Sequence, residues 1–359
     1  MLQLKVLGGS DVSDPSKITY HSPTEVPASS TRLNVLTDGF GRFHSYLRIS
    51  LIEQCNLRCS YCMPEDGLDW TPAQQLLTDQ EVIRLAKVFV NEGVTKIRLT
   101  GGEPLLRKSI INIVEEIGSL TGLKTLSITT NGLLLKRNLP RLQMAGLNSI
   151  NLSLDTLHED RFYELTKRHA LHKVLDAIDY ALEIGYHPLK INCVVMCGVN
   201  EDELVDFAQL TLNRPVEVRF IEFMPFDGNR WNETQLVSYQ EMLYTLRDAF
   251  PLEEIACGKH ETAKLYRIPK ALGQIGFITS MTDDFCAGCN RLRITADGHL
   301  KVCLFGRAEV NLRDAMRHGA DDEDLLQLIG SAVDAKHAKH AGMHRIANSE
   351  NRPMITIGG

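Results

Sequence analysis

The sequence lacks any long apolar run. Its uninterrupted apolar stretches are short, such as residues 193–197, whereas a membrane-spanning helix needs about 20 predominantly apolar residues. It also lacks the features of a secretory signal, because residues 2–7 are too short for the apolar region and Asp11 and Asp14 follow them. We therefore expect no membrane span and a location in the cytoplasm.

An excess of positive charge is lacking too. The chain has 39 Lys and Arg residues against 45 Asp and Glu residues, which gives a net charge of −6. Nonspecific binding to nucleic acid needs a basic surface, so nucleic acid is not an expected partner. An anionic small molecule would have to be bound by a local cluster of basic side chains.

Two groups of cysteines each lack a fourth member. The first group is Cys55, Cys59 and Cys62, and the second is Cys286, Cys289 and Cys303. In a reducing compartment, clustered cysteines indicate metal or redox chemistry rather than disulfides. The other three cysteines lie apart and suggest no role: Cys193, Cys197 and Cys257.

The chain divides into three regions by its apolar pattern. Residues 1–35 have no sustained apolar period and predict a flexible N-terminal extension. In residues 36–250, short apolar runs alternate with amphipathic stretches. The expected strands are residues 46–52, 96–100, 125–129, 149–153, 189–196 and 216–223. The expected helices are residues 79–92, with Thr78 as the cap, 109–119, 173–184 and 201–212.

Six successive strand–helix units predict a parallel sheet joined by right-handed crossovers. The pattern leaves open whether the sheet is a doubly wound layer or a curved barrel, but in both cases ligands bind at the carboxyl ends of the strands. Polar or glycine-rich residues follow several expected strands: Gly101-Gly102-Glu103-Pro104, Thr130-Asn131-Gly132 and Asp155. We therefore expect the active site at this edge.

Residues 251–359 do not continue the alternation. They predict a C-terminal region of mixed strands and turns that carries the second cysteine group, with helices at about 309–317 and 321–340.

The first cysteine group has the spacing C-x3-C-x2-C directly after the first expected strand. Three thiolates can hold three irons of a [4Fe–4S] cluster, whereas complete protein ligation needs a fourth cysteine. The open iron could bind the amino and carboxylate groups of S-adenosylmethionine. An electron from the reduced cluster would then release a 5′-deoxyadenosyl radical. The alternative is a zinc site completed by a distant ligand such as His44, although zinc sites usually contain paired C-x2-C or histidine sets.

The second group has the spacing C-x2-C-x13-C, again without a fourth cysteine. A second cluster with an open iron could bind substrate directly, and the alternatives are structural zinc or a cluster that only carries electrons. Arg291 and Arg293 follow Cys289 at a spacing that places both on one face of a strand. Two guanidinium groups side by side favour a phosphate-bearing ligand. Three further basic residues can point into the same mouth: Arg48, Arg98 and Lys190.

Taken together, these motifs resemble those of the GTP 3′,8-cyclase family of molybdenum cofactor biosynthesis, within the radical S-adenosylmethionine (SAM) superfamily. The resemblance runs from about Leu36 to the last residue. The matching segments are residues 38–48, 55–64, 97–104, 129–132, 151–155, 220–224 and 285–293, and the final Gly358-Gly359.

The resemblance implies an α/β fold, an incomplete (βα)6 barrel of the TIM type, with a C-terminal extension that carries the second cluster. It implies that a 5′-deoxyadenosyl radical abstracts the ribose 3′ hydrogen of GTP and that the ribose carbon then bonds to C8 of guanine. The expected cofactors are two [4Fe–4S] clusters and SAM.

The resemblance also assigns residues. Those expected to contact SAM are Tyr61, Gly102, Ser153 and Met224. Those expected to contact GTP are Arg48, Arg98, Thr129, Lys190, Arg291 and Arg293. The six clustered cysteines would hold the metal, with Cys55, Cys59 and Cys62 as the catalytic group, and the open iron of the second cluster would bind the guanine edge. The tail glycines, Gly358 and Gly359, would reach into the active site.

Implied partners are a flavodoxin- or ferredoxin-like electron donor and, downstream, cyclic pyranopterin monophosphate synthase. The oligomeric state is left open, with a homodimer as one option. Two alternative functions remain: a peptide-modifying radical SAM enzyme and a metal-stabilised binding module without turnover. A separate pattern consists of three histidines at helical spacing: His337, His340 and His344. It is interpreted as a solvated helix face, because no cysteine or carboxylate completes a metal site there.

Overall fold

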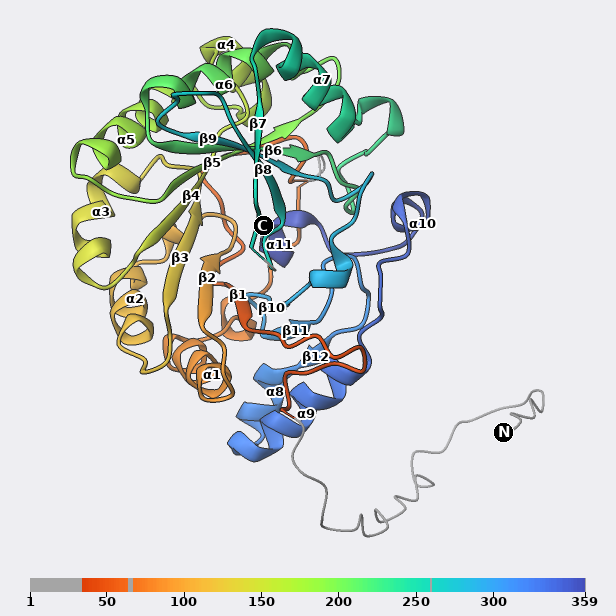
Figure 1. Cartoon of the computed structure of the whole chain (residues 1–359). Helices are drawn as coiled ribbons and strands as arrows, with labels where there is room; N and C mark the ends of the chain where they lie inside the picture. Colours follow the sequence, from red (N-terminus) through yellow and green to blue (C-terminus); the bar gives the residue numbers. More distant parts are fainter. Residues whose placement is uncertain (1–33, 64–66, 259, 359) are drawn as a thin grey trace, which may run out of the picture. The chain divides into compact units, whose positions relative to one another are not determined.

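The computed structural model describes residues 34–63, 67–258 and 260–358. Within them, twelve strands form one sheet in the order β12-β11-β10-β1-β2-β3-β4-β5-β6-β9-β8-β7. The two ends of this order do not pair, so the curved sheet is an open barrel (Figure 1). The N-terminal extension predicted for residues 1–35 lies outside the described residues, apart from Asn34 and Val35.

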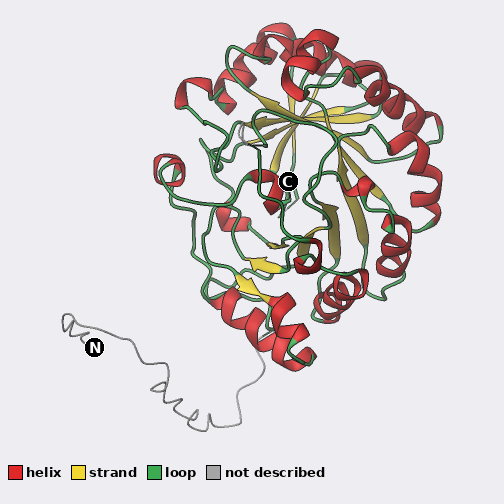
Figure 2. Cartoon of the chain, turned by 180° about the vertical axis from the view of Figure 1, so that it is seen from behind, coloured by secondary structure: helices red, strands yellow, loops and turns green. Residues whose placement is uncertain are grey.

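The six strands expected from the sequence form the parallel centre of the sheet, as predicted. They are β1 (Tyr46–Ser50), β2 (Lys96–Thr100), β3 (Thr125–Thr130), β4 (Ser149–Ser153), β5 (Leu189–Val195) and β6 (Val216–Glu222). Of the two sheet types left open by the sequence, the curved barrel is the one observed (Figure 2).

Helices lie against the outer face of the sheet (Figures 1 and 2). They are α1 (Asp79–Asn91), α2 (Ile110–Gly118), α3 (Leu135–Met144), α4 (Glu159–Thr166), α5 (Leu171–Glu183), α6 (Leu204–Asn213) and α7 (Tyr239–Ala249). Thr78 caps α1 as expected, because its Oγ1 accepts a hydrogen bond of 3.2 Å from the Glu81 amide and Glu81 Oε2 accepts one of 2.8 Å from the Thr78 amide.

The two faces of each strand differ in polarity, and this difference positions the site. On β1, Leu47 and Ile49 are fully buried in the apolar layer between sheet and helices, whereas Tyr46 and Arg48 line the interior of the barrel. Successive side chains of a strand point to opposite faces. Burial of the outer residues therefore forces the polar ones on every second position into the barrel.

The C-terminal region extends the sheet at both edges. β10 (Arg291–Ile294) pairs in parallel with β1, and β9 (Gln274–Ile278) pairs in parallel with β6. The remaining short strands are antiparallel: β7 (Glu253–Ile255), β8 (Ala263–Arg267), β11 (His299–Lys301) and β12 (Val310–Asn311). The domain boundary predicted after residue 250 thus falls just beyond α7, within one continuous sheet.

Four helices end the described chain: α8 (Leu312–Arg317), α9 (Asp322–Asp334), α10 (Met343–Ala347) and α11 (Met354–Ile357). The helix predicted for 321–340 is shorter than expected, because it ends at Asp334. Therefore His337, His340 and His344 do not share a helix face. Helix α11 lies inside the ring of strands in both views (Figures 1 and 2). No helix in the described ranges is long and apolar enough to cross a membrane.

Candidate active site

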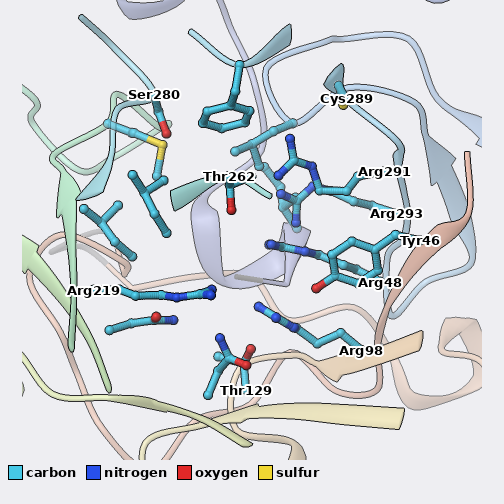
Figure 3. Close-up of a pocket in the computed structure, with 18 of the residues that line it drawn as sticks. Tyr46, Arg48, Arg98, Thr129, Arg219, Thr262, Ser280, Cys289, Arg291 and Arg293 are labelled. Carbon is cyan, nitrogen blue, oxygen red and sulfur yellow. The ribbon is translucent and has the colours of Figure 1, made fainter. Parts of the chain in front are cut away.

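The interior of the barrel holds a cavity of about 410 Å³. Inward-facing residues of β1 to β6 line it, together with β10 and the loops that carry the second cysteine group. Side chains labelled in Figure 3 point into this space from several strands, among them Arg48, Arg98 and Arg219. The sequence predicted the site at the carboxyl ends of the strands. The cavity extends further, from Tyr46 and Lys96 at the beginning of β1 and β2 to Ser153 at the end of β4.

Seven basic side chains line this cavity and are here called the basic cluster. They are Arg48, Lys96, Arg98, Lys190, Arg219, Arg291 and Arg293. The five that the sequence predicted to share one mouth are thus brought together. Pairing of β10 with β1 explains this for the C-terminal pair, since it places Arg291 beside Tyr46 and Arg293 beside Arg48.

Burial and mutual repulsion destabilise charges of the basic cluster, although Glu217 forms ion pairs with Arg219 and Lys190. Burial, together with the neighbouring Arg48 and Arg219 charges, lowers the pKa of Arg98 to about 9, although Tyr46 opposes the shift. Burial and the Arg219 charge lower the pKa of Lys190 to about 8, against the opposing effect of Glu217, whose Oε2 lies 3.6 Å from Lys190 Nζ. Both shifts mean that the cationic forms are destabilised. An anionic ligand in the cavity would relieve that cost.

Three residues of this region were not singled out by the sequence: Tyr46, Lys96 and Arg219. Each lies two positions along its strand from another residue that lines the cavity. Since residues two apart on a strand share a face, this alternation could have identified them. Tyr46 is buried, and its hydroxyl has no hydrogen-bond partner among the described residues. Burial raises its pKa, but the charges of Arg98, Arg48, Lys96 and Arg291 outweigh that effect and lower it to about 7.

The first cysteine group lies beside this cavity. Cys55, Cys59 and Cys62 line a smaller pocket of about 100 Å³ that also contains Gly102. Residues shared by the two pockets include Tyr61, Thr129, Ser153, Asp155 and Met354. The cysteine loop therefore adjoins the space that the basic cluster lines.

Close backbone packing explains the two glycines after β2. A Cβ on Gly101 would lie 2.5 Å from the carbonyl oxygen of Ile52, and at Gly101 φ is +151°. A Cβ on Gly102 would meet the carbonyl oxygens of Glu53 and Gln54. Only glycine permits such an approach, so the Gly-Gly pair is required to hold the segment that leads into the cysteine loop.

Glu103 and Asp155 secure the loops around the first group. Buried Glu103 accepts hydrogen bonds from Thr130 Oγ1 at 2.8 Å and the Asn131 amide at 2.8 Å, and burial raises its pKa to about 7 against those bonds. Asp155 accepts a hydrogen bond of 2.7 Å from the Tyr61 hydroxyl and one of 2.9 Å from the Val194 amide. Burial raises the pKa of Asp155 to about 6.

The residues expected to contact SAM surround this junction. Gly102 lines the smaller pocket, Tyr61 and Ser153 line both pockets, and Met224 lines the main cavity. Their positions are compatible with one ligand that lies between the cysteine loop and the cavity.

The first group fits a cationic cluster by its chemistry. Burial and the charge of Cys55 raise the pKa of Cys62 to about 12, and burial with the charges of Cys62 and Asp155 raises the pKa of Cys59 well above its ordinary value. Three thiolates here would repel one another unless a cation compensates them, and the irons of a cluster do so. Within the described chain, no group of three His, Cys, Asp or Glu side chains is arranged to hold a single metal ion. A [4Fe–4S] cluster distributes its cysteines over separate irons.

The second group lines the main cavity itself: Cys286, Cys289 and Cys303. Lys336 Nζ donates a hydrogen bond to Cys289 Sγ at 3.4 Å. Burial raises the pKa of Cys289, but the charges of Arg291 and Lys336 outweigh it and lower the pKa to about 6. This sulfur is therefore prepared to be a thiolate, the form that binds metal.

His44, the distant ligand considered for a zinc site, belongs to the surroundings of the second group. Its Nδ1 lies 2.9 Å from the carbonyl oxygen of Leu36, and its Nε2 lies 2.8 Å from Lys336 Nζ. Both ring nitrogens are therefore engaged. The isolated cysteines are outside the site: Cys193 is buried, and Cys197 and Cys257 are exposed.

The tail reaches the inner face of the barrel. Gly358 adopts φ +81°, and a Cβ there would lie 2.6 Å from Thr100 Oγ1 and 2.8 Å from Ser50 Cβ. Both contacts come from the carboxyl ends of β1 and β2. Gly358 therefore packs at the carboxyl ends of β1 and β2. A place for the tail in the active site stays a prediction, and Gly359 lies outside the described residues.

Comparison with known proteins gives matches over most of the chain. The family model of the radical SAM superfamily matches residues 49–211, and that of Molybdenum Cofactor Synthesis C matches residues 216–342. The chain is 56% identical over 327 residues to the mitochondrial GTP 3′,8-cyclase of Arabidopsis thaliana, covering 91% of this chain and 84% of that protein. It is 38% identical over 325 residues to the GTP 3′,8-cyclase of Alkaliphilus oremlandii, covering 90% of this chain and all of that protein.

Other relatives are longer. Molybdenum cofactor biosynthesis protein 1 of Mus musculus is 59% identical over 324 residues, which are 90% of this chain but 51% of that protein. The chain thus spans about half the length of the first relatives it matches. Among solved structures, Streptococcus suis SuiB has a TM-score of 0.56 at 16% identity and covers 86% of this chain and 69% of SuiB. At this identity the likeness concerns the fold alone.

Proposed function

The chain belongs to the GTP 3′,8-cyclase family of the radical SAM superfamily, and on that premise we propose that it converts GTP to (8S)-3′,8-cyclo-7,8-dihydroguanosine 5′-triphosphate, the first step of molybdenum cofactor biosynthesis. The observation that carries the proposal is a single cavity lined by seven basic side chains and by the second three-cysteine group. The loop with the first three cysteines adjoins this cavity.

Cys55, Cys59 and Cys62 would hold one [4Fe–4S] cluster and Cys286, Cys289 and Cys303 the other. When bound, the first cluster and SAM supply a 5′-deoxyadenosyl radical that removes the ribose 3′ hydrogen of GTP. The residues proposed to hold SAM beside it are Tyr61, Gly102, Ser153 and Met224, which border the junction of the two pockets.

The basic cluster is proposed to bind the triphosphate. Its lowered pKa values at Arg98 and Lys190 reflect cations that burial destabilises, and a multiply charged phosphate group would restore their charged forms. The GTP contacts inferred from the family are Arg48, Arg98, Thr129, Lys190, Arg291 and Arg293. The structure supports adding Lys96 and Arg219, because both line the same cavity.

The second cysteine group would receive the guanine edge. It lines the same cavity as the basic cluster, so a nucleotide could contact the cations with its phosphates and the second cysteine group with its base. Fixing both ends of the nucleotide would restrict the approach of the ribose carbon to C8, and such restriction is a large part of what a protein contributes to bond formation.

Exclusion of water is proposed for the tail and the second cysteine loop. A carbon radical is quenched by solvent and by stray hydrogen donors, so the site must be closed during the reaction. Helix α11 lies inside the ring of strands, and Met354 and Ile357 line the cavity. The peptide-modifying alternative has no comparable support, since the charged side chains that line this cavity are mainly cationic.

The partners are proposed on the same premise. They are an electron donor of the flavodoxin or ferredoxin type and the cyclic pyranopterin monophosphate synthase that consumes the product. A homodimer and a cytoplasmic location also remain proposals, and one relative is described as mitochondrial.

The proposal is tested by turnover of the anaerobically prepared protein. We expect about eight irons and no zinc per chain, and formation of 5′-deoxyadenosine and a cyclised nucleotide from SAM, GTP and a reductant. A Cys59→Ser variant should lose both products. Tightly bound zinc in place of iron, or 5′-deoxyadenosine without any change in GTP, would contradict the proposal.

A further inference from the structure

Asn151 carries a buried amide that has no hydrogen-bond partner among the residues that the structure describes. It lies in β4 with no exposed surface, it lines the main cavity, and neither its Nδ2 nor its Oδ1 has a hydrogen-bond partner in the part of the chain that the structure describes. Leaving both a donor and an acceptor unpaired in a protein interior is costly. Such a side chain is expected where a ligand, rather than the fold, completes its hydrogen bonds.

The neighbours of Asn151 make this a neutral region. Asn151 pairs in register with Thr129 of β3 and Lys190 of β5. Thr129 Oγ1 and Asn192 Oδ1 also lack hydrogen-bond partners among the described residues, and both side chains line the cavity. We call Thr129, Asn151 and Asn192 the neutral belt.

The neutral belt borders two chemically different parts of the site. Two positions beyond Asn151, toward the carboxyl end of β4, Ser153 borders the pocket of the first cysteine group. Lys190, in register beside Asn151, and Arg98 belong to the basic cluster. The substrate would place its anionic part on the cations and its reacting carbon near the first cysteine group. An uncharged polar portion of the molecule would then lie against the neutral belt.

For a nucleoside triphosphate, that portion is the sugar. The ribose carries two neighbouring hydroxyl groups, each able to donate and to accept. A carboxamide presents one donor and one acceptor side by side, which matches a vicinal diol. It is a poorer match for phosphate, which offers only acceptors and already faces seven cations.

We propose that Asn151 recognises the ribose diol of the substrate, with its amide N–H donating to one hydroxyl and its amide oxygen accepting from the other. Asn151 is then a specificity-determining and positioning residue, which distinguishes a ribonucleotide from its 2′-deoxy analogue. By fixing both hydroxyls it also orients C3′ toward the Ser153 side of the cavity. This inference rests on the proposed function, because it takes GTP as the ligand.

Equilibrium binding to the cluster-loaded protein without SAM tests it, so that no turnover is needed. The ligands are GTP, 2′-deoxyGTP and 3′-deoxyGTP, and the variants are wild type and Asn151→Leu, which has a similar size but no polar group. We expect wild type to bind GTP about tenfold more tightly than either deoxy analogue, as for one or two hydrogen bonds. In Asn151→Leu, GTP should bind at least about tenfold more weakly, and 2′-deoxyGTP should lose less affinity than GTP, because only the contact to its 3′ hydroxyl is removed.

Two controls separate recognition from a structural role. Ser149→Ala changes a buried residue on the same strand that does not line the cavity, and it should leave the preference for GTP unchanged. The thermal midpoint of ligand-free Asn151→Leu should equal or exceed that of wild type, because an unpaired buried amide has been removed. A structural amide would give a lower midpoint.

Equal weakening of GTP and 2′-deoxyGTP binding in Asn151→Leu would overturn the inference, and so would a wild type that does not prefer GTP. Failure of the proposed function is read out separately, as the absence of a cyclised nucleotide from the wild-type turnover assay.

Discussion

Tyr46 lies against the basic cluster. Charged groups face it from its own strand, from β2 and from β10. Lys96 Nζ lies 4.8 Å from the centre of its ring, and the guanidinium carbons of Arg48 and Arg98 each lie 5.5 Å away. Arg291, its register partner on β10, and Arg293 complete the set. These cations stabilise the phenolate, which is why the pKa of Tyr46 falls to about 7 despite its burial.

The affinity for GTP should therefore depend on the ionisation of Tyr46. Bound phosphates would neutralise the cations and raise the pKa of the phenol again, so the protonated form binds GTP better. As pH rises from 6.5 to 8.5, the phenolate forms and repels the phosphates. We expect the wild-type affinity to fall about tenfold relative to that of Tyr46→Phe over this range, measured as the ratio of their Kd values.

Titration of GTP itself affects both proteins alike and cancels in that ratio. At pH 6.5, Tyr46→Phe should bind GTP about threefold to tenfold more weakly, because it lacks the hydroxyl donor. Parallel Kd profiles for the two proteins would show that Tyr46 does not ionise near the ligand.

Sequence reasoning found the motif residues and missed those between motifs. Arg48 and Arg98 belong to recognised segments, whereas Lys96 and Arg219 lie within strands whose pattern alone predicts only secondary structure. Alternation along each strand gives the face a residue occupies but not which faces line a cavity. For Tyr46, the environment also had to be known, since a lone tyrosine on a strand is usually an ordinary core residue.

At the scale of elements, the C-terminal segment is attached by a charged network. Arg352 donates from Nε to Glu309 Oε1 at 2.9 Å and from Nη1 to Asp297 Oδ2 at 2.9 Å. Lys301, which is 1% exposed, donates to Glu309 at 3.0 Å and to Asn351 at 3.2 Å. This network precedes α11 directly and holds it within the ring of strands.

Breaking the network should release α11 without unfolding the barrel. For Arg352→Met, loss of hydrogen bonds between charged groups should weaken local closure by about 2 kcal/mol. We expect amide hydrogen exchange at residues 355–358 to rise about 30-fold, the factor that this energy corresponds to. Formation of 5′-deoxyadenosine without cyclised product should rise as water enters.

Arg345→Met is the matched control, because Arg345 is exposed on α10 and its side chain takes no part in the network. It should leave unchanged both the amide hydrogen exchange at residues 355–358 and the ratio of 5′-deoxyadenosine to cyclised product. If Arg352→Met leaves exchange at residues 355–358 as in wild type, the network does not anchor α11.

The elements themselves divide into those that local pattern could predict and those it could not. The six parallel strands and α1 follow from periodicity and a capping box. Helix α3 contains Pro140, which argues against a helix in the sequence, and tertiary packing overrides it. The pairing of β10 with β1 joins residues about 245 positions apart, and no local signal encodes such a contact.

At the scale of the whole molecule, the arrangement joins the two three-cysteine groups through one cavity. Parallel strands bring the first cysteine loop to the carboxyl edge, and the return of the chain as β10 beside β1 brings Arg291 and Arg293 to the same interior. The sequence could identify both cysteine groups, and their cluster chemistry stays a prediction. That they share one cavity follows only from the topology of the sheet.

The central claim is that the adenosyl radical formed at the first cysteine group removes the 3′ hydrogen of GTP bound in this cavity. Transfer of label tests it most directly. GTP carrying deuterium at the ribose 3′ position is incubated with the reduced protein and SAM, and the 5′-deoxyadenosine is analysed by mass spectrometry. We predict one deuterium in the 5′-deoxyadenosine and none from GTP labelled at other ribose positions. Unlabelled 5′-deoxyadenosine, formed together with cyclised nucleotide from the 3′-labelled substrate, would contradict the account.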